Sequence, residues 1–80
     1  MPQPDRLSKG AVGGVIRTLR HKRGLTIEGL AHEAGLHPTY VSGIERGRGN
    51  PSLEVLIQLA AALEVRVSEI LRRAEAARSD

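Results

Sequence analysis

Hydrophobic residues recur along this chain at the period of an α-helix, with polar residues between them. The first such stretch runs over residues 12–23, where Val12, Val15, Ile16 and Leu19 follow the i, i+3, i+4, i+7 spacing of one helix face. Gly24 follows the stretch, and glycine is typical of a position just past a helix end. The pattern therefore predicts a first helix that ends before Gly24.

A second and a third helix are predicted over residues 27–34 and 37–46. Thr26 precedes the second helix and is a favourable N-cap, and Gly35 ends it. The apolar positions of this helix are Ile27, Leu30, Ala31 and Ala34. Pro38 suits the first turn of the third helix, in which Val41 and Ile44 are the inward positions.

Two further helices are predicted over residues 53–63 and 67–78. Ser52 is the expected N-cap of the fourth helix, whose buried face is predicted to be Leu53, Leu56, Ile57, Ala60 and Leu63. The stripe of the fifth helix is predicted to be Val67, Ile70, Leu71, Ala74 and Ala77. Since no stretch alternates with the two-residue period of a strand, the chain is predicted to be an all-α domain of five short helices.

The second and third predicted helices are joined by a turn too short to allow much besides a steep crossing. Ala31 has to be small where the next helix backbone crosses, and Gly35 can adopt the left-handed conformation that the turn requires. The wedge between the two helices is expected to be filled by Leu30, Val41 and Ile44. Together these positions form the helix-turn-helix pattern, here over residues 27–46.

Composition narrows the possible chemistry. The 80 residues contain no cysteine, which excludes a disulfide framework, a thiolate zinc site and a cysteine nucleophile. Tyr40 is the single aromatic residue, so no platform of stacked bases can be built. The formal net charge is +3, and the basic excess lies in residues 1–50, where eight Lys and Arg face four acidic residues. This charge is compatible with a nucleic-acid partner but is too small to establish one.

The ends of the chain differ from its middle. Residues 1–9 contain Pro2 and Pro4 and show no periodicity, so we expect a flexible tail followed by one domain over residues 10–78. The longest apolar run, residues 56–63, is far shorter than the ~20 residues of a membrane span. No signal-peptide pattern is visible, and we expect a cytoplasmic protein without a membrane partner.

Three segments carry a resemblance to a known family: IRTLRHKRGLT, LAHEAGLHPTYVSGIERGRGNPSLEVL and LAAALEVRVSEIL. Together they resemble the Cro and phage-repressor type of helix-turn-helix regulator, also called the xenobiotic-response-element (XRE) family. The stretch TYVSGIERGRGNPS is especially similar to restriction-modification controller proteins. The resemblance implies a compact five-helix domain of the lambda-repressor-like type that binds double-stranded DNA, as a homodimer on an inverted repeat. The expected mechanism is transcriptional regulation by occupancy of an operator.

The resemblance also implies which residues contact DNA. The recognition helix, residues 37–46, is expected to enter the major groove, where Thr39 and Ser42 can hydrogen-bond to bases and Arg46 can contact a guanine or a phosphate. Arg48 and Asn50, in the loop that follows, are expected at phosphates. The complete predicted set is Thr26, His37, Pro38, Thr39, Tyr40, Ser42, Gly43, Arg46, Arg48 and Asn50.

Two structural roles follow from the same resemblance. Arg20 and Glu45 match a family pair in which a salt bridge ties the first helix to the end of the recognition helix. The apolar stripe of the fifth helix, together with the corner before it, is expected to form the dimer interface. That predicted interface consists of Leu63, Val65, Val67, Ile70, Leu71 and Ala74.

Metal and enzymatic chemistry are not expected. His32 and Glu33 begin an HExxH string, but Leu36 occupies the place of the second histidine. The other histidines, His21 and His37, fall at divergent positions, so no metal site is predicted. No other cofactor and no small-molecule ligand is expected either. The chain offers no paired carboxylates, nucleophile–base set or phosphate-binding loop, and an enzyme is therefore not expected.

Two other functions remain open at this point. The same fold serves antitoxins of toxin–antitoxin pairs, which a co-purifying toxin would identify. It also serves protein-interaction modules that have lost DNA binding, which the absence of salt-sensitive DNA binding would identify.

Overall fold

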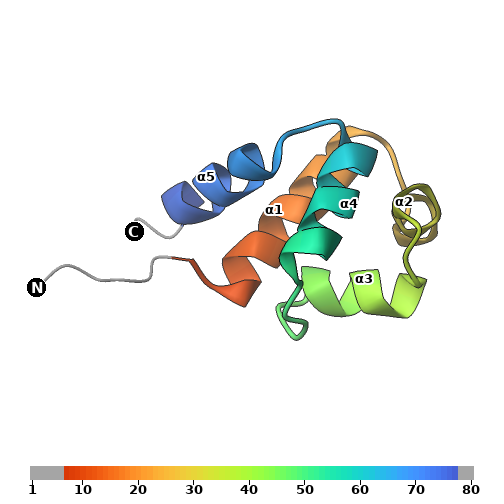
Figure 1. The fold of residues 1–80 in the computed structure, drawn as a ribbon, viewed down its shortest axis with the longest axis horizontal. Coiled ribbons are helices and arrows are strands. Elements are labelled where there is room, and N and C mark those ends of the chain that lie inside the picture. The colour runs from red at the N-terminus through yellow and green to blue at the C-terminus, as the bar shows by residue number, and fades with distance from the viewer. Residues whose placement is uncertain (1–6, 78–80) are drawn as a thin grey trace, which may run out of the picture.

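The structure, a computed structural model, describes residues 7–77 as five α-helices joined by short loops (Figure 1). In chain order they are α1 (Lys9–Lys22), α2 (Ile27–Ala34), α3 (Pro38–Glu45), α4 (Leu53–Leu63) and α5 (Val67–Ala77). No strand occurs within this part of the chain. The predicted all-α architecture is therefore confirmed, with each helix in the expected order.

Polar side chains cap the N-terminal ends of the helices. Thr26 Oγ1 accepts a hydrogen bond from the Gly29 amide at 2.9 Å, and Ser52 Oγ accepts one from the Val55 amide at 3.1 Å. Each cap satisfies one of the first-turn amides, which have no partner inside the helix. The caps predicted at Thr26 and Ser52 are both present.

The start of α1 corrects one expectation. Ser8 is the N-cap of this helix and accepts a hydrogen bond from the Ala11 amide at 3.0 Å, while Leu7 packs against the core. Since α1 already begins at Lys9, the tail predicted over residues 1–9 is too long at its C-terminal end. Residues 1–6 of that predicted tail lie outside the described residues.

The turn between α2 and α3 has the expected backbone geometry. Gly35 has φ of +73°, and the Leu36 amide donates a hydrogen bond to the Ala31 carbonyl at 2.8 Å. A side chain at position 35 would be strained in this left-handed conformation, whereas glycine adopts it freely. The chain therefore turns sharply, and only three residues, 35–37, separate α2 from α3.

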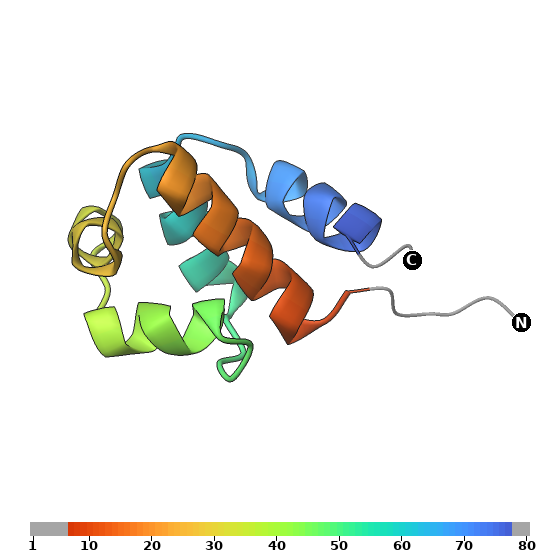
Figure 2. The same ribbon diagram turned by 180° about the vertical axis from the view of Figure 1, so that it is seen from behind.

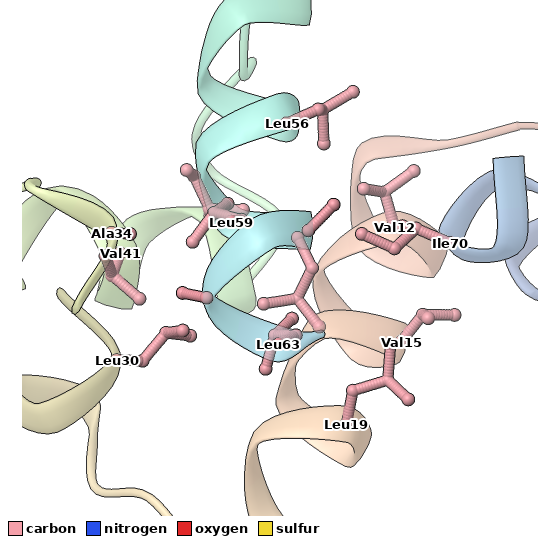
Figure 3. Close-up of a cluster of buried hydrophobic side chains, with 14 of the residues drawn as sticks. Val12, Val15, Leu19, Leu30, Ala34, Val41, Leu56, Leu59, Leu63 and Ile70 are labelled. Atoms are coloured by element: carbon pink, nitrogen blue, oxygen red, sulfur yellow. The ribbon is translucent and has the colours of Figure 1, made fainter. Parts of the chain in front are cut away.

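The core forms where all five helices meet (Figure 3). The largest side chains that are completely buried come from every helix: Ile16, Leu30, Val41, Ile44, Leu59 and Ile70. α1 packs against α3, α4 and α5, while α2 packs against α3 and α4 (Figure 2). This arrangement holds α3 by its inward face and leaves its opposite face at the surface.

The buried face of α4 differs from the prediction. Leu53 and Ile57 were expected in the core, but they are 65% and 52% exposed. The buried face instead consists of Leu56, Leu59, Ala60, Ala62 and Leu63. Because this helix is apolar on nearly every side, its sequence spacing fits more than one face, and packing against α1, α2 and α5 selects among them.

Candidate DNA-binding surface

A buried salt bridge fixes the C-terminal end of α3. Arg20 of α1 donates from Nε to Glu45 Oε2 at 2.7 Å and from Nη2 to Oε1 at 2.9 Å. The two side chains are only 9% and 4% exposed. Arg20 Nη1 also donates to the Leu25 carbonyl at 2.9 Å, so one side chain joins α1, α3 and the loop before α2. This is the pairing expected for Arg20 and Glu45.

The electrostatics of this pair favour the charged state of the arginine. The hydrogen bond to Glu45, reinforced by the charges of Glu45 and Glu28, raises the pKa of Arg20 even though burial opposes its charge. Removing either partner would leave a charge with little access to water, which is strongly destabilising. The pair therefore sets the position of α3 rather than contributing chemistry.

A close helix crossing adds a second constraint on α3. A Cβ atom at Gly13 of α1 would overlap the Ile44 carbonyl oxygen and would lie 2.9 Å from the Glu45 carbonyl oxygen. α1 and the last turn of α3 thus approach backbone to backbone at this point. The absence of a side chain at residue 13 allows the approach, and the spacing of apolar residues gave no sign of it.

Grooves border α3 on both sides. One side has two adjoining hollows of about 460 and 290 Å³, which share Arg20, Ile27 and Ser42. We call them together the inner groove, and its further lining residues are Arg17, Thr26, Glu28, Pro38, Thr39, Glu45 and Arg46. The other side has the loop-side hollow of about 470 Å³, lined by His37, Thr39, Tyr40, Gly43, Arg48 and Gly49. Thr39 lines both, so it lies on the ridge between them.

The structure gathers most of the predicted DNA-contacting residues on this surface. His37 is the N-cap of α3, with its Nδ1 accepting a hydrogen bond from the Thr39 amide at 3.1 Å, and Arg46 is the C-cap. A Cβ atom at Gly43 would meet nothing within 4 Å, so the backbone is open to the outside there. Asn50 is the exception, since it lines a separate hollow beside the start of α1 and α5.

The exposed arginines of this surface form no ion pair within the described residues. Within residues 7–77, Arg17, Arg46 and Arg48 form no salt bridge, whereas Arg23, Arg72 and Arg73 each pair with a glutamate. Arg17 lines the inner groove with Arg46 and was not among the predicted residues. The sequence could have indicated Arg17, because it lies three residues before Arg20 and therefore on the same face of α1.

The predicted dimer interface needs correction. Leu63, Ile70 and Ala74 are at most 3% exposed, because they fill the core of the single protomer. Only Val65, Val67 and Leu71 of that set retain some surface, and they too pack against the core. A stripe on the last helix fits either a core or an interface by spacing alone, and here α1 and α4 cover it.

Two further properties concern residues 7–77, the part of the chain that the structure describes. None of its helices has the length and apolar character needed to cross a membrane. No group of three or more histidine, aspartate or glutamate side chains gathers there as a metal site would require. His21, His32 and His37 lie apart on α1, α2 and the turn before α3.

The fold and this surface define a helix-turn-helix domain whose second helix presents a polar face between two grooves. The sequence pattern of the helix-turn-helix family matches residues 16–70. The chain belongs to this family, in its XRE-type branch of transcriptional regulators, which are not enzymes.

Three similar proteins illustrate the relationship. The regulator DdrOP3 of Deinococcus deserti is 42% identical over 60 residues, which cover 75% of this chain and 46% of DdrOP3. The restriction-modification controller protein C.AhdI of Aeromonas hydrophila has a solved structure with a TM-score of 0.76 and 40% identity, covering 78% of this chain and 94% of C.AhdI. SinR, a master regulator for biofilm formation solved in complex with DNA, gives a TM-score of 0.72 and 36% identity, covering 75% of this chain and 97% of that chain.

The matched region makes up only part of some relatives. It spans less than half the length of DdrOP3, of the regulator SlrR and of the phage phi105 immunity repressor. In C.AhdI, by contrast, it spans nearly the whole solved chain.

Proposed function

We propose that this protein is a sequence-specific regulator of transcription that binds an inverted-repeat operator as a homodimer. The observation that carries the proposal is the surface of α3. Its polar outward face stands between two grooves, Arg46 and Arg48 beside it are free of ion pairs, and a buried salt bridge holds the helix in place. These are the features that a helix needs to enter the major groove.

The proposed contacts divide into two kinds. Thr39, Ser42 and Gly43 lie on the outward side of α3, where hydroxyl groups and open backbone can approach base edges. Thr26 Oγ1 and His37 Nδ1 already accept hydrogen bonds from helix-cap amides, and Pro38 follows His37, so these three contribute mainly to phosphate contacts and to the shape of the groove. Arg48 is the proposed phosphate contact on the loop side, whereas Asn50 is the weakest member of the set because it lines another hollow.

The proposed dimer requires an apolar surface that the protomer does not use itself. Leu53 and Ile57 supply one, since they lie one helical turn apart on α4 and are largely exposed. A two-fold contact of this stripe with its copy would be isologous, as in most closed dimers. It would replace the interface expected on α5, where the apolar side chains face inward.

The test is selection of DNA by the purified protein from a pool of randomised duplexes, followed by footprinting on the selected sequence. We expect two protected half-sites related by inverted symmetry, with centres about 34 Å or one DNA turn apart. Binding of equal strength to every duplex would contradict sequence-specific recognition. No salt-sensitive binding to any duplex would contradict the function as a whole and favour a protein-interaction module.

A further inference from the structure

The two arginines of the inner groove that lack ion pairs come from different helices. Arg17 is on α1 and Arg46 caps α3, and both line its hollow of about 290 Å³. The other charged residues of this hollow, Arg20 and Glu45, neutralise each other through two hydrogen bonds. The positive charge of the hollow therefore rests on Arg17 and Arg46.

The acidic residues nearby do not cancel this charge. Glu45 is committed to Arg20, and Glu28 lines the other hollow of the inner groove, near the N-terminal end of α2. The charge of Glu28 also raises the pKa of Arg20, so Glu28 lies on the Arg20 side of the inner groove. The end of the groove nearest Arg17 and Arg46 is thus the positive end, and it borders the C-terminal end of α3.

The location of Arg46 separates it from the base-reading part of the helix. In helix-turn-helix proteins the first residues of the recognition helix contact base edges, and flanking elements contact the backbone. Arg46 is past the last helical residue of α3, and the hollow that it lines is bordered by Arg17 and Arg20 of α1 and does not include Thr39. This position fits a phosphate better than a guanine.

We infer that Arg17 and Arg46 bind the same DNA phosphate from two sides, so that Arg46 positions the protein on the backbone and does not read a base. The inference rests on the proposed function. Two guanidinium groups around one phosphate can donate several charge-assisted hydrogen bonds to its oxygens. The buried pair Arg20–Glu45 lines the same hollow and ties α1 to the end of α3, so the backbone positions that carry Arg17 and Arg46 are fixed relative to each other.

The test is a salt titration of DNA binding between 50 and 200 mM NaCl with Arg17→Ala, Arg46→Ala and the double variant. The probes are the duplex that the wild-type protein selects and a scrambled duplex of the same composition. Each neutralised phosphate contributes about 0.9 to the slope of log K against log salt. We expect each single variant to weaken binding by the same factor on both duplexes, and the double variant to lower the slope by about one per protomer.

Arg66→Ala is the matched control, because Arg66 is exposed in the α4–α5 loop, lies outside both grooves and forms no salt bridge with any of residues 7–77. It should leave the slope unchanged. A slope that falls by about two per protomer in the double variant would place the arginines on separate phosphates and overturn the shared site. A loss restricted to the selected duplex in Arg46→Ala would make Arg46 a base reader, and wild-type affinity of Arg17→Ala on both duplexes would remove Arg17 from the interface.

These outcomes are separate from those of the proposed function. If the wild-type protein binds neither duplex, both proposals fail together. If it binds the selected duplex and the arginine variants bind as wild type does, only the shared phosphate site fails. Thermal melting of each variant by circular dichroism identifies any loss that comes from unfolding; since Arg17 and Arg46 are exposed, we expect melting temperatures like that of the wild type.

Discussion

Among single residues, the position and surface of α3 depend on one buried side chain and on two glycines that lack one. Glu45 accepts two hydrogen bonds from Arg20, and the pair is almost completely buried. Gly13 has no Cβ atom, which leaves room for the carbonyl oxygens of Ile44 and Glu45. Gly43 leaves the outward surface of the same helix open. Each of these positions supports a separate prediction.

Replacing Glu45 by alanine is expected to destabilise the fold strongly. Breaking a buried ion pair by removing one partner costs about 3–5 kcal/mol, because the remaining charge stays buried without compensation. In a domain of this size, that corresponds to a fall in melting temperature of more than about 10 °C. The control is Glu75→Ala on α5, an exposed position for which a change within about 0.5 kcal/mol is expected. Equal, small shifts in thermal melting would contradict the structural role of the pair.

Alanine substitutions at the adjacent glycines 13 and 14 of α1 are expected to change the free energy of unfolding in opposite directions. Alanine is favoured over glycine inside a helix by about 0.5–1 kcal/mol. At Gly14 a Cβ atom meets nothing within 4 Å, so Gly14→Ala should stabilise the protein by roughly that amount. At Gly13 the same atom would collide with the backbone of α3, and Gly13→Ala should destabilise despite its better propensity. Chemical denaturation measures both, and stabilisation by Gly13→Ala would contradict the close crossing.

Gly43 offers a way to separate folding from DNA binding. Gly43→Ala should keep or slightly raise stability, because the added methyl group meets no protein atom within 4 Å. If the backbone of α3 approaches the DNA at this point, the methyl group should weaken binding by about tenfold or more, equivalent to about 1.4 kcal/mol. Melting and duplex-binding measurements on one preparation check both halves. Unchanged affinity would mean that the DNA backbone and bases stay clear of residue 43.

At the scale of elements, the helices differ in what decides their place. α2 and α3 are eight residues each and carry few buried residues, so the turn at Gly35 and the anchors to α1 determine their angle. α4 is apolar on nearly every side, and its neighbours choose which side is buried. α5 is amphipathic and carries its own ion pairs on the polar side.

Those ion pairs predict a small pH dependence of stability in α5. Hydrogen bonds from Arg73 and Arg72 lower the pKa of Glu69 from its ordinary value. A carboxyl whose folded pKa is lowered stabilises the fold above its unfolded pKa, near 4.3, and loses that effect as the pH falls through the folded pKa. Glu69→Gln should therefore melt slightly below the wild type at pH 7 and together with it in strong acid. Glu75→Gln, on the same helix but outside these ion pairs, is the control that should melt with the wild type at pH 7.

At the scale of the whole molecule, the core leaves one apolar stripe outside. Leu53 and Ile57 of α4 are exposed, whereas Ile70 of α5 is completely buried. A dimer built on the exposed stripe would combine two domains, each of which already has a closed core. The assembly and the fold can therefore be disturbed independently.

Ile57→Asp is expected to separate these two properties. The aspartate remains in water in the monomer but would be desolvated in the dimer, so dimerisation should weaken by about 100-fold or more, near 3 kcal/mol, with little loss of helicity. Ile70→Asp should instead unfold the protein, because it places a charge in the core. Sedimentation velocity at micromolar concentration, with circular dichroism, distinguishes the two. A wild-type protein that sediments as a monomer at high micromolar concentration would contradict the dimer, and a dimeric Ile57→Asp would place the interface elsewhere.

The number and order of the helices, the caps at Thr26 and Ser52 and the turn at Gly35 could be predicted from the sequence. These features depend on neighbours three or four residues away and on backbone conformations that particular residue types prefer, so local spacing carries the information. The pairing of Arg20 with Glu45, 25 residues apart, was also predicted, but through the family resemblance and not from spacing.

The packing of the helices against one another determines which surfaces the protein presents. It turned Leu53 and Ile57 of α4 outward, enclosed Leu63, Ile70 and Ala74 in the core, and placed Asn50 in a hollow lined by α1, α4 and α5. It also brought Arg17 of α1 to Arg46 of α3. The physical reason is the same in each case. A helical period predicts which residues share a face, but the helices that pack against that face determine whether it becomes core, groove or free surface.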